Sequence, residues 1–320
     1  MIFVPTRKLL IVNRILSPRS LAALAVFTAV FAPTPAHAVG DPFTCTAVTY
    51  QVVGAQLKIG AVSNGALTYT NVGAAHAQNY NAGGYNTVDD YIYAISSLRE
   101  VLQISSDGTV VATGIAGIPS DASFVAGDVT PDGLSLIAFN ATDKSVWSID
   151  LLTVAGTQIG NLGSADVGDF AIVNDGGTTT AYGFDTATGN LQFFDPTANP
   201  IIVDNNTSVE IGAGGAKGAV WADSSGNLTV YVNGTGDVYS VKNPSAASPV
   251  VKKVASGPSG FQNDGMKCAL AASAFPNPDE SNEDLAATGA SPIALSLIAF
   301  TSLALFAVGK TIRRTRRLES

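Results

Sequence analysis

Few residues in the middle of this chain could carry out acid–base or nucleophilic chemistry. Residues 39–289 contain one histidine, His76, so these residues hold no His-rich metal site, and a Ser-His-Asp triad would depend on His76 alone. Between residues 39 and 270 there are two glutamates, Glu100 and Glu210, which does not indicate a glycosidase pair, although aspartates could serve. This composition favours binding over catalysis.

Three aspartates recur at related positions of a short repeated motif and are the candidates for a metal site. They are Asp128, Asp169 and Asp264. A ring of carboxylates could bind a cation such as Ca²⁺. Alternatively, each carboxylate could accept hydrogen bonds from backbone N–H groups at the start of a strand. We favour the second interpretation, and the sequence indicates no cofactor otherwise.

The chain has two cysteines, Cys45 and Cys268. In an exported protein such a pair predicts a disulfide. The alternative is two unpaired buried thiols. If both are oxidised, neither can act as a nucleophile.

The region that must position these residues is a repeat. A small-Gly-small motif is centred on Gly83, Gly127, Gly168 and Gly218, with a fifth copy at Asp264, and the steps between them are 44, 41, 50 and 46 residues. Each of the first four copies precedes two short β-rich patches with turn residues between them. Such a period with short strands is typical of the blades of a β-propeller. The sequence therefore predicts an all-β propeller.

Each of the two ends of this repeat region lacks the part of a blade that the other end contains. Strands are expected at 44–52, 57–62 and 67–72 with no motif copy before them, and the fifth copy has no strands after it. If the C-terminal copy completes the blade begun by the N-terminal strands, two open sheet edges disappear. This predicts five blades, or six if the 50-residue step contains a further element.

Two segments carry a resemblance to a known family. Gly83-Gly84-Tyr85-Asn86 with the nearby Asp90-Tyr91-Ile92-Tyr93, and the closing Asn263-Asp264-Gly265-Met266-Lys267-Cys268, resemble an uncharacterised family of secreted bacterial propeller-like domains. The resemblance covers roughly residues 45–270. It implies the fold and carries no activity with it.

The N-terminal residues predict export. Residues 1–38 contain the basic residues Arg7, Lys8, Arg14 and Arg19, an apolar stretch over 21–31, and the small-x-small sequence Ala36-His37-Ala38. This is the pattern of a secretory signal peptide. Cleavage is expected between Ala38 and Val39.

The C-terminal residues 285–320 predict attachment to a cell wall. The apolar stretch 292–308 is long enough for a short membrane-spanning helix, and the basic tail 310–317 follows it. Ahead of it, Leu285-Ala286-Ala287-Thr288-Gly289 resembles the Leu-Ala-x-Thr-Gly motif of sortase substrates in high-GC Gram-positive bacteria (Actinobacteria). The resemblance implies cleavage after Thr288 and covalent attachment of Thr288 to peptidoglycan. The alternative is a simple membrane anchor.

These observations predict a propeller domain at 39–270, an acidic, proline-containing linker at 271–284 and a sorting signal. Residues 39–289 hold 8 basic and 24 acidic residues, and this excess of negative charge excludes nucleic acid as a partner. We expect an exported, wall-anchored surface protein that displays the propeller for recognition, adhesion or scaffolding, with a carbohydrate or protein ligand. The alternative is a secreted carbohydrate-active hydrolase or lyase on the same fold.

The anchoring prediction is tested by Thr288→Ala. Without the residue that would be joined to the wall, the protein should disappear from purified wall and become extractable by detergent. Cell fractionation with immunodetection measures both. If the unaltered protein is already fully extracted by detergent, the tail is a simple membrane anchor.

Overall fold

The computed structural model describes residues 40–275 except 176, 199–200, 213–214 and 261. The predicted signal peptide with Ala38 and Val39, most of the linker and the whole sorting signal lie outside the described residues, so those predictions remain predictions. The described residues form β-strands joined by turns and short loops. None of them belongs to a helix with the length and apolar character needed to cross a bilayer.

Three of the sheets have four antiparallel strands each, in sequence order from the first strand to the last. One consists of β4 (Tyr80–Tyr85), β5 (Ile92–Ser96), β6 (Glu100–Ile104) and β7 (Val110–Gly114). The next consists of β8 (Phe124–Val129), β9 (Ser135–Asn140), β10 (Ser145–Asp150) and β11 (Ala155–Asn161). The third consists of β12 (Val167–Asp175), β13 (Thr178–Asp185), β14 (Asn190–Phe194) and β15 (Asp204–Glu210).

The remaining strands form two four-stranded units that meet at one edge. One unit consists of β16 (Lys217–Ala222), β17 (Leu228–Val232), β18 (Asp237–Lys242) and β19 (Val250–Ser256). The other runs in the order β20 (Asn263–Lys267), β1 (Thr49–Val53), β2 (Gln56–Ser63) and β3 (Ala66–Asn71). A single parallel pair, Ser256 with Ala66, joins them.

The N-terminal and C-terminal strands therefore share a sheet, which confirms the predicted closure. β1 and β20 are antiparallel over five residue pairs, from Thr49 with Lys267 to Val53 with Asn263. Directly beyond this ladder, Cys45 and Cys268 form the predicted disulfide, with Cα atoms 5.3 Å apart. Hydrogen bonds and a covalent bond thus hold the two ends of the described chain together.

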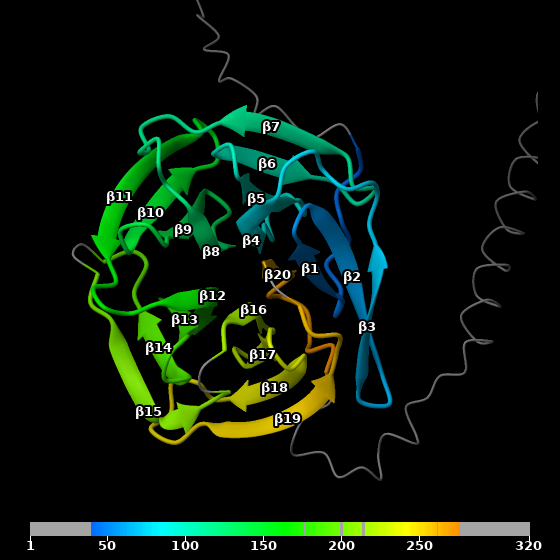
Figure 1. Cartoon of the computed structure of the whole chain (residues 1–320), viewed down its shortest axis with the longest axis vertical. Helices are drawn as coiled ribbons and strands as arrows, with labels where there is room; N and C mark the ends of the chain where they lie inside the picture. Colours follow the sequence, from blue (N-terminus) through cyan, green and yellow to red (C-terminus); the bar gives the residue numbers. More distant parts are fainter. Residues whose placement is uncertain (1–39, 176, 199–200, 213–214, 261, 276–320) are drawn as a thin grey trace, which may run out of the picture. The chain divides into compact units, whose positions relative to one another are not determined.

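The sheets are arranged around a central axis, with one strand of each unit nearest the centre (Figure 1). These inner strands contact one another in a closed cycle: β4 with β8, β8 with β12, β12 with β16, β16 with β20, and β20 with β4. The fold is all-β with the sheets of a propeller. We call the side of the ring at which the inner strands end the C-face, and the side at which they begin the N-face.

The repeat motif of the sequence forms the inner strands, and the two β-rich patches after each copy form the second and third strands. Glycines occupy tight turns between consecutive strands: Gly108 after β6, Gly133 after β8 and Gly226 after β16 have φ of 83°, 72° and 73°, in the left-handed region that glycine adopts without a steric penalty. At the axis, a Cβ on Gly84 would lie 2.3 Å from the backbone nitrogen of Val129. Only glycine allows β4 to approach β8 this closely.

Two expectations about strands are corrected. The first strand begins at Thr49 and not at residue 44, because Phe43 is buried in the core and Cys45 is held by its disulfide. The outermost strands β7, β11, β15 and β19 were not predicted from the sequence. Most of their residues are exposed or half-buried, so they lack the run of buried apolar residues that marks the strands nearer the axis.

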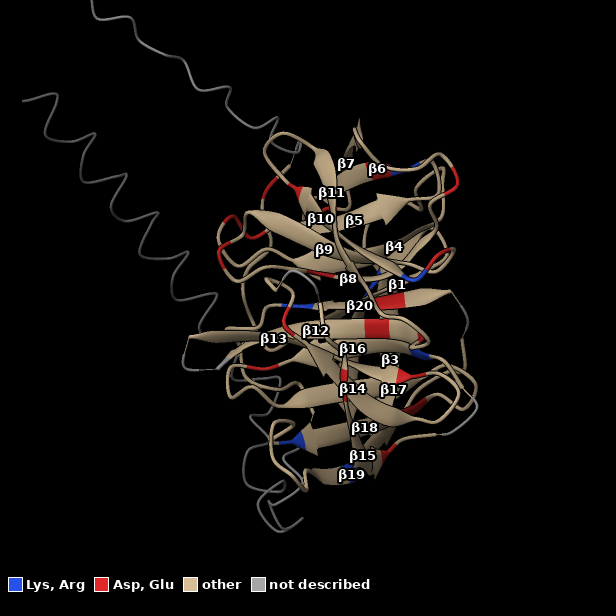
Figure 2. Cartoon of the chain, turned by 90° about the vertical axis from the view of Figure 1, so that its left-hand side faces the viewer, with Lys and Arg blue, Asp and Glu red and all other residues tan. Residues whose placement is uncertain are grey.

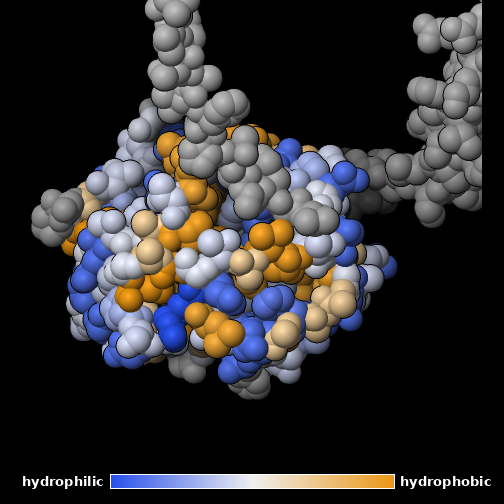
Figure 3. Space-filling model, turned by 90° about the horizontal axis from the view of Figure 1, so that it is seen from above, coloured by the Kyte–Doolittle hydropathy of each residue, from blue (hydrophilic) through white to orange (hydrophobic). Residues whose placement is uncertain are grey.

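The core fills the wedges between neighbouring sheets. All five residues of β5 and of β17 are buried, because both faces of these strands are covered. One cluster, which includes Trp147, lies between the sheets of β4 and β8, and another, around Phe170, lies between those of β8 and β12. Acidic residues lie in many of the surface turns (Figure 2). On the side seen in Figure 3, apolar patches are separated by polar residues.

Replacing both cysteines by alanine tests the contribution of the closure. The disulfide spans 223 residues of sequence, so the chain-entropy model predicts that its loss lowers the free energy of unfolding by ~5 kcal/mol. Denaturant titration of the oxidised protein and of the Cys45→Ala/Cys268→Ala variant measures the difference. Reduced wild-type protein should behave like the variant. An unfolding midpoint that reduction leaves unchanged would contradict the prediction.

Candidate functional site

The three aspartates identified in the sequence lie on inner strands and connect neighbouring sheets. Asp128 of β8 accepts a hydrogen bond from the backbone N–H of Ile172 in β12 at 2.8 Å. Asp169 of β12 accepts one from Val220 in β16 at 2.7 Å. Each carboxylate also accepts the N–H of the next residue in its own strand, at 2.8 Å and 2.7 Å. Both oxygens of each group are therefore occupied.

Asp264 of β20 makes the corresponding link between the sheet that contains both chain ends and the sheet of β4. Its Oδ2 accepts the N–H of Gly83 in β4. The N–H of Gly265 in β20 is donated to Oδ2 of Asp169 at 3.2 Å, so β20 is also linked to β12 across the axis. The carboxylates thus satisfy backbone donors of inner strands that face the axis.

Asp169 and Asp264 are buried neighbours, and each carboxyl group affects the pKa of the other. Oδ1 of Asp264 has no hydrogen-bond partner among the described residues, so a proton on this carboxyl group would relieve the burial of an unpaired charged oxygen. Burial raises the pKa of Asp264 to about 8. Burial and the neighbouring Asp264 carboxylate hold the pKa of Asp169 well above its usual range. At neutral pH this pair retains a proton.

The recurrence of aspartate in the motif is explained by these hydrogen bonds without a cation. They differ from the expected capping of a strand start, because each carboxylate reaches a neighbouring strand. Within the described residues, no group of three His, Cys, Asp or Glu side chains is arranged to hold a metal ion.

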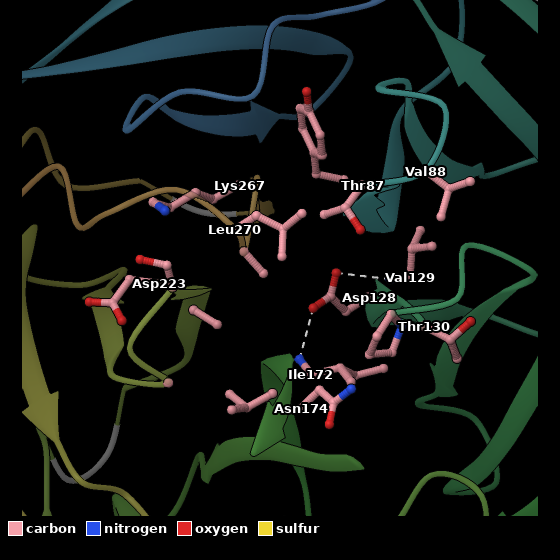
Figure 4. A pocket seen from close by; sticks show the side chains of 17 residues that line it. Thr87, Val88, Asp128, Val129, Thr130, Ile172, Asn174, Asp223, Lys267 and Leu270 are labelled. Atoms are coloured by element: carbon pink, nitrogen blue, oxygen red, sulfur yellow. Dashed lines mark hydrogen bonds between the residues drawn. The ribbon is translucent and has the colours of Figure 1, made fainter. Parts of the chain in front are cut away.

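A large cavity opens on the C-face beside the axis. Its volume is about 480 Å³, and we call it the axial cavity (Figure 4). Its walls come from the ends of all the inner strands and the turns that follow them. Thr87, Thr130, Asn174 and Ser224 contribute polar groups, and Val88, Ile172 and Leu270 contribute apolar ones.

Three charged residues line the axial cavity. Lys267 donates from Nζ to the backbone carbonyls of Cys268 at 3.0 Å and Ala271 at 2.8 Å. Burial lowers the pKa of Lys267 to about 8, against the opposing effect of Asp223. Burial raises the pKa of Asp128 to about 7. The cavity therefore combines a cation with one carboxylate, Asp223, and a second that titrates near neutrality.

The candidate residues His76 and Glu100 lie away from the axial cavity. His76 accepts the N–H of Gln78 at Nδ1, 3.1 Å away, and its ring meets Tyr80 edge-on. Glu100 accepts the hydroxyl of Ser96 at 2.9 Å. Neither lines the axial cavity, so the structure brings only Asp128 of the candidate residues to it.

Lys267, Asp223 and Leu270 line the cavity but could not be recognised from the sequence as site residues by their types alone. Each lies a few residues after a copy of the repeat motif, as Thr87 and Thr130 do. The reason is that the inner strand containing the motif ends at the C-face a few residues later. Reading the residues just after each predicted inner strand would have found the cavity wall.

The arrangement of sheets around an axis, with a cavity at one mouth, defines a protein of the β-propeller class. The family described as a repeat of unknown function (DUF6923) matches residues 47–270, and the chain belongs to this family. No curated protein matches the chain.

Several solved structures are similar to the chain in fold. A chain of the nidogen/laminin complex is 12% identical, with a TM-score of 0.47 over 67% of this chain and 79% of that one. Streptogramin B lyase is 9% identical, with a TM-score of 0.40 over 67% and 61%. The β-propeller domain of Cps50 (Swd1) from Myceliophteria thermophila is 11% identical, with a TM-score of 0.39 over 68% and 89%.

The buried carboxyl pair predicts an unusual dependence of stability on pH. A carboxyl group whose pKa is higher in the folded than in the unfolded protein binds its proton more tightly when folded. The stability it confers is therefore present at acidic pH and is lost as the pH rises towards the folded value, about 8 for Asp264. Asp128, with a pKa of about 7, acts in the same direction. The unfolding midpoint in urea should fall between pH 5 and pH 8.

Asp264→Asn supplies the matched test. The asparagine amide can donate to Asp169 permanently while its oxygen accepts the N–H of Gly83. This variant should lose stability less steeply between pH 5 and pH 8 and should be at least as stable as wild type at pH 8. Equal slopes for the two proteins would show that the pair does not retain a proton.

Proposed function

We propose that this protein is an exported surface protein, joined through Thr288 to peptidoglycan by a sortase, whose propeller recognises an extracellular ligand at the axial cavity. The observation that carries the recognition role is the cavity itself. It has the size of a small-molecule site and combines apolar walls with a few convergent polar groups. The ligand would be a carbohydrate or a segment of a protein.

The features of the cavity suit binding. Leu270 and Val88 are 69% and 67% exposed at its edge, where they offer apolar contact without being needed in the core. Lys267 and Asp223 provide opposite charges that can orient a polar ligand. Asp128 is already engaged with two backbone N–H groups, which favours a structural role for it.

The alternative function is a secreted carbohydrate-active hydrolase or lyase. One observation favours it: Asp128, whose pKa of about 7 suits a general acid or base, shares the cavity with Asp223. A hydrolase screen with polysaccharide substrates addresses this alternative. Turnover that Asp223→Asn abolishes would support an enzyme and replace the recognition proposal.

We also propose that the propeller has five blades. The closed cycle of contacts among β4, β8, β12, β16 and β20 supports this number. Each of these strands leads a four-stranded unit. The 50-residue step between Gly168 and Gly218 is occupied by a single such unit, β12 to β15, in the described residues.

Leu270→Trp tests the recognition site. The larger ring should fill the mouth of the axial cavity without disturbing the core, because Leu270 is 69% exposed. On glycan and peptide arrays, binding by the full-length protein should fall at least tenfold. Leu152→Trp is the control, since Leu152 is 57% exposed and does not line the cavity. Equal binding by both variants would place recognition elsewhere.

A further inference from the structure

A second cavity opens on the N-face, where the inner strands begin. Its volume is about 390 Å³, and it is lined by the starts of β4 and β8, the end of β5, the turn after β1, and Gln262 just before β20. We call it the Gln262 cavity. It lies at the opposite end of the inner strands from the axial cavity and shares no lining residue with it.

The Gln262 cavity presents amide and hydroxyl groups that the protein leaves uncommitted. The side-chain amides of Asn79 and Gln262 and the hydroxyl of Ser123 line it. None of these groups forms a side-chain hydrogen bond within the described residues. Asn81 uses its Oδ1 for the N–H of Ala82 at 2.9 Å, which leaves its amide N–H groups for a ligand. Both donors and acceptors therefore converge on one space.

The remaining walls are apolar and rigid. The buried side chains of Tyr80, Phe124 and Ile95 are 5%, 8% and 2% exposed. They are held by the core and cannot move away when a ligand enters. Such walls give a ligand apolar contact beside the polar groups.

No Asp, Glu, Lys or Arg lines the Gln262 cavity, whereas Lys267, Asp223 and Asp128 line the axial cavity. In a domain with so many acidic residues, the lining of this cavity is uncharged, and the nearby carboxylate of Glu100 is engaged by the hydroxyl of Ser96 at 2.9 Å. A charged ligand would find no counter-ion here and would lose hydration without compensation. An uncharged ligand with many hydroxyl groups matches both the amides and the apolar walls.

At the edge of the Gln262 cavity the backbone adopts an unfavourable conformation that hydrogen bonds stabilise. Gln262 has a φ of 55°, in the left-handed region that is unfavourable for a residue with a side chain. Its carbonyl accepts the N–H of Gly54 at 2.9 Å, and the carbonyl of Gly54 accepts the N–H of Tyr80 at 3.1 Å. These bonds fix the position from which the glutamine side chain projects.

We propose that the Gln262 cavity is a binding site for a neutral saccharide, independent of the axial cavity. The amides of Gln262, Asn79 and Asn81 and the hydroxyl of Ser123 would bind sugar hydroxyls. The small exposed parts of Tyr80 and Phe124 would give a sugar apolar contact beside these polar groups. This site is separate from the recognition site proposed above, so either could fail without the other.

The test uses the full-length protein in detergent with cellobiose, maltose and N,N′-diacetylchitobiose as neutral probes, at up to 10 mM, in isothermal titration calorimetry. We expect at least one probe to bind, and Asn79→Ala and Gln262→Asn each to weaken it at least fivefold. Gln262→Asn retains an amide and suits the left-handed backbone, but it shortens the reach by one methylene. A weaker fold therefore cannot explain its effect.

Asn174→Ala distinguishes the two cavities, because Asn174 lines the axial cavity and does not line the Gln262 cavity. It should leave binding unchanged. Glucuronate and glucosamine, as charged probes, should bind at least tenfold more weakly than the best neutral probe. The proposal is overturned if no neutral probe binds at 10 mM, if Asn174→Ala weakens binding as much as Gln262→Asn, or if the charged probes bind best.

Discussion

The hydrogen bonds that backbone N–H groups donate to aspartate side chains of neighbouring inner strands are the constraint on which this ring depends. An inner strand pairs with a neighbour on one side only, so its other edge leaves N–H groups facing the axis. Neighbouring inner strands do not form a ladder with each other. Asp128, Asp169 and Asp264 provide the missing acceptors for Ile172, Val220 and Gly83. Each bond connects two sheets and satisfies a buried donor whose isolation would be unfavourable.

The placement of glycine follows from the same geometry. Where two inner strands approach backbone to backbone, as at Gly84 beside Val129, a side chain would collide. Where they lie slightly farther apart, an aspartate spans the gap. The spacing of the inner strands around the axis therefore explains the small-Gly-small motif and its recurring aspartates. The consequence is a cluster of buried carboxyl groups, and burial raises the pKa of Asp169 and of Asp264, which disfavours full ionisation of the cluster.

Much of the fold could be predicted because its buried strands repeat with apolar residues and turn glycines at a regular interval. The pairing of Cys45 with Cys268 could be predicted because two cysteines fell at the two ends of that repeat. The outer strands could not, because exposed strands such as β7 carry no apolar alternation. The cavities could not either. Their residues are ordinary in type, and only the fold brings Lys267 to Asp223, or Gln262 to Asn79.

The two ends of the described chain lie on the same face of the ring. Gly40 accepts a hydrogen bond from Tyr91, and Ala271 accepts one from Ser224, so both ends lie at the C-face with the axial cavity. In the proposed attachment, the residues from Phe275 to Thr288 span at most ~45 Å when fully extended. The axial cavity would then lie close to the wall, and the Gln262 cavity would lie at the other end of the inner strands. A ligand of the wall and a ligand of the surroundings could therefore be bound on opposite faces of one rigid ring.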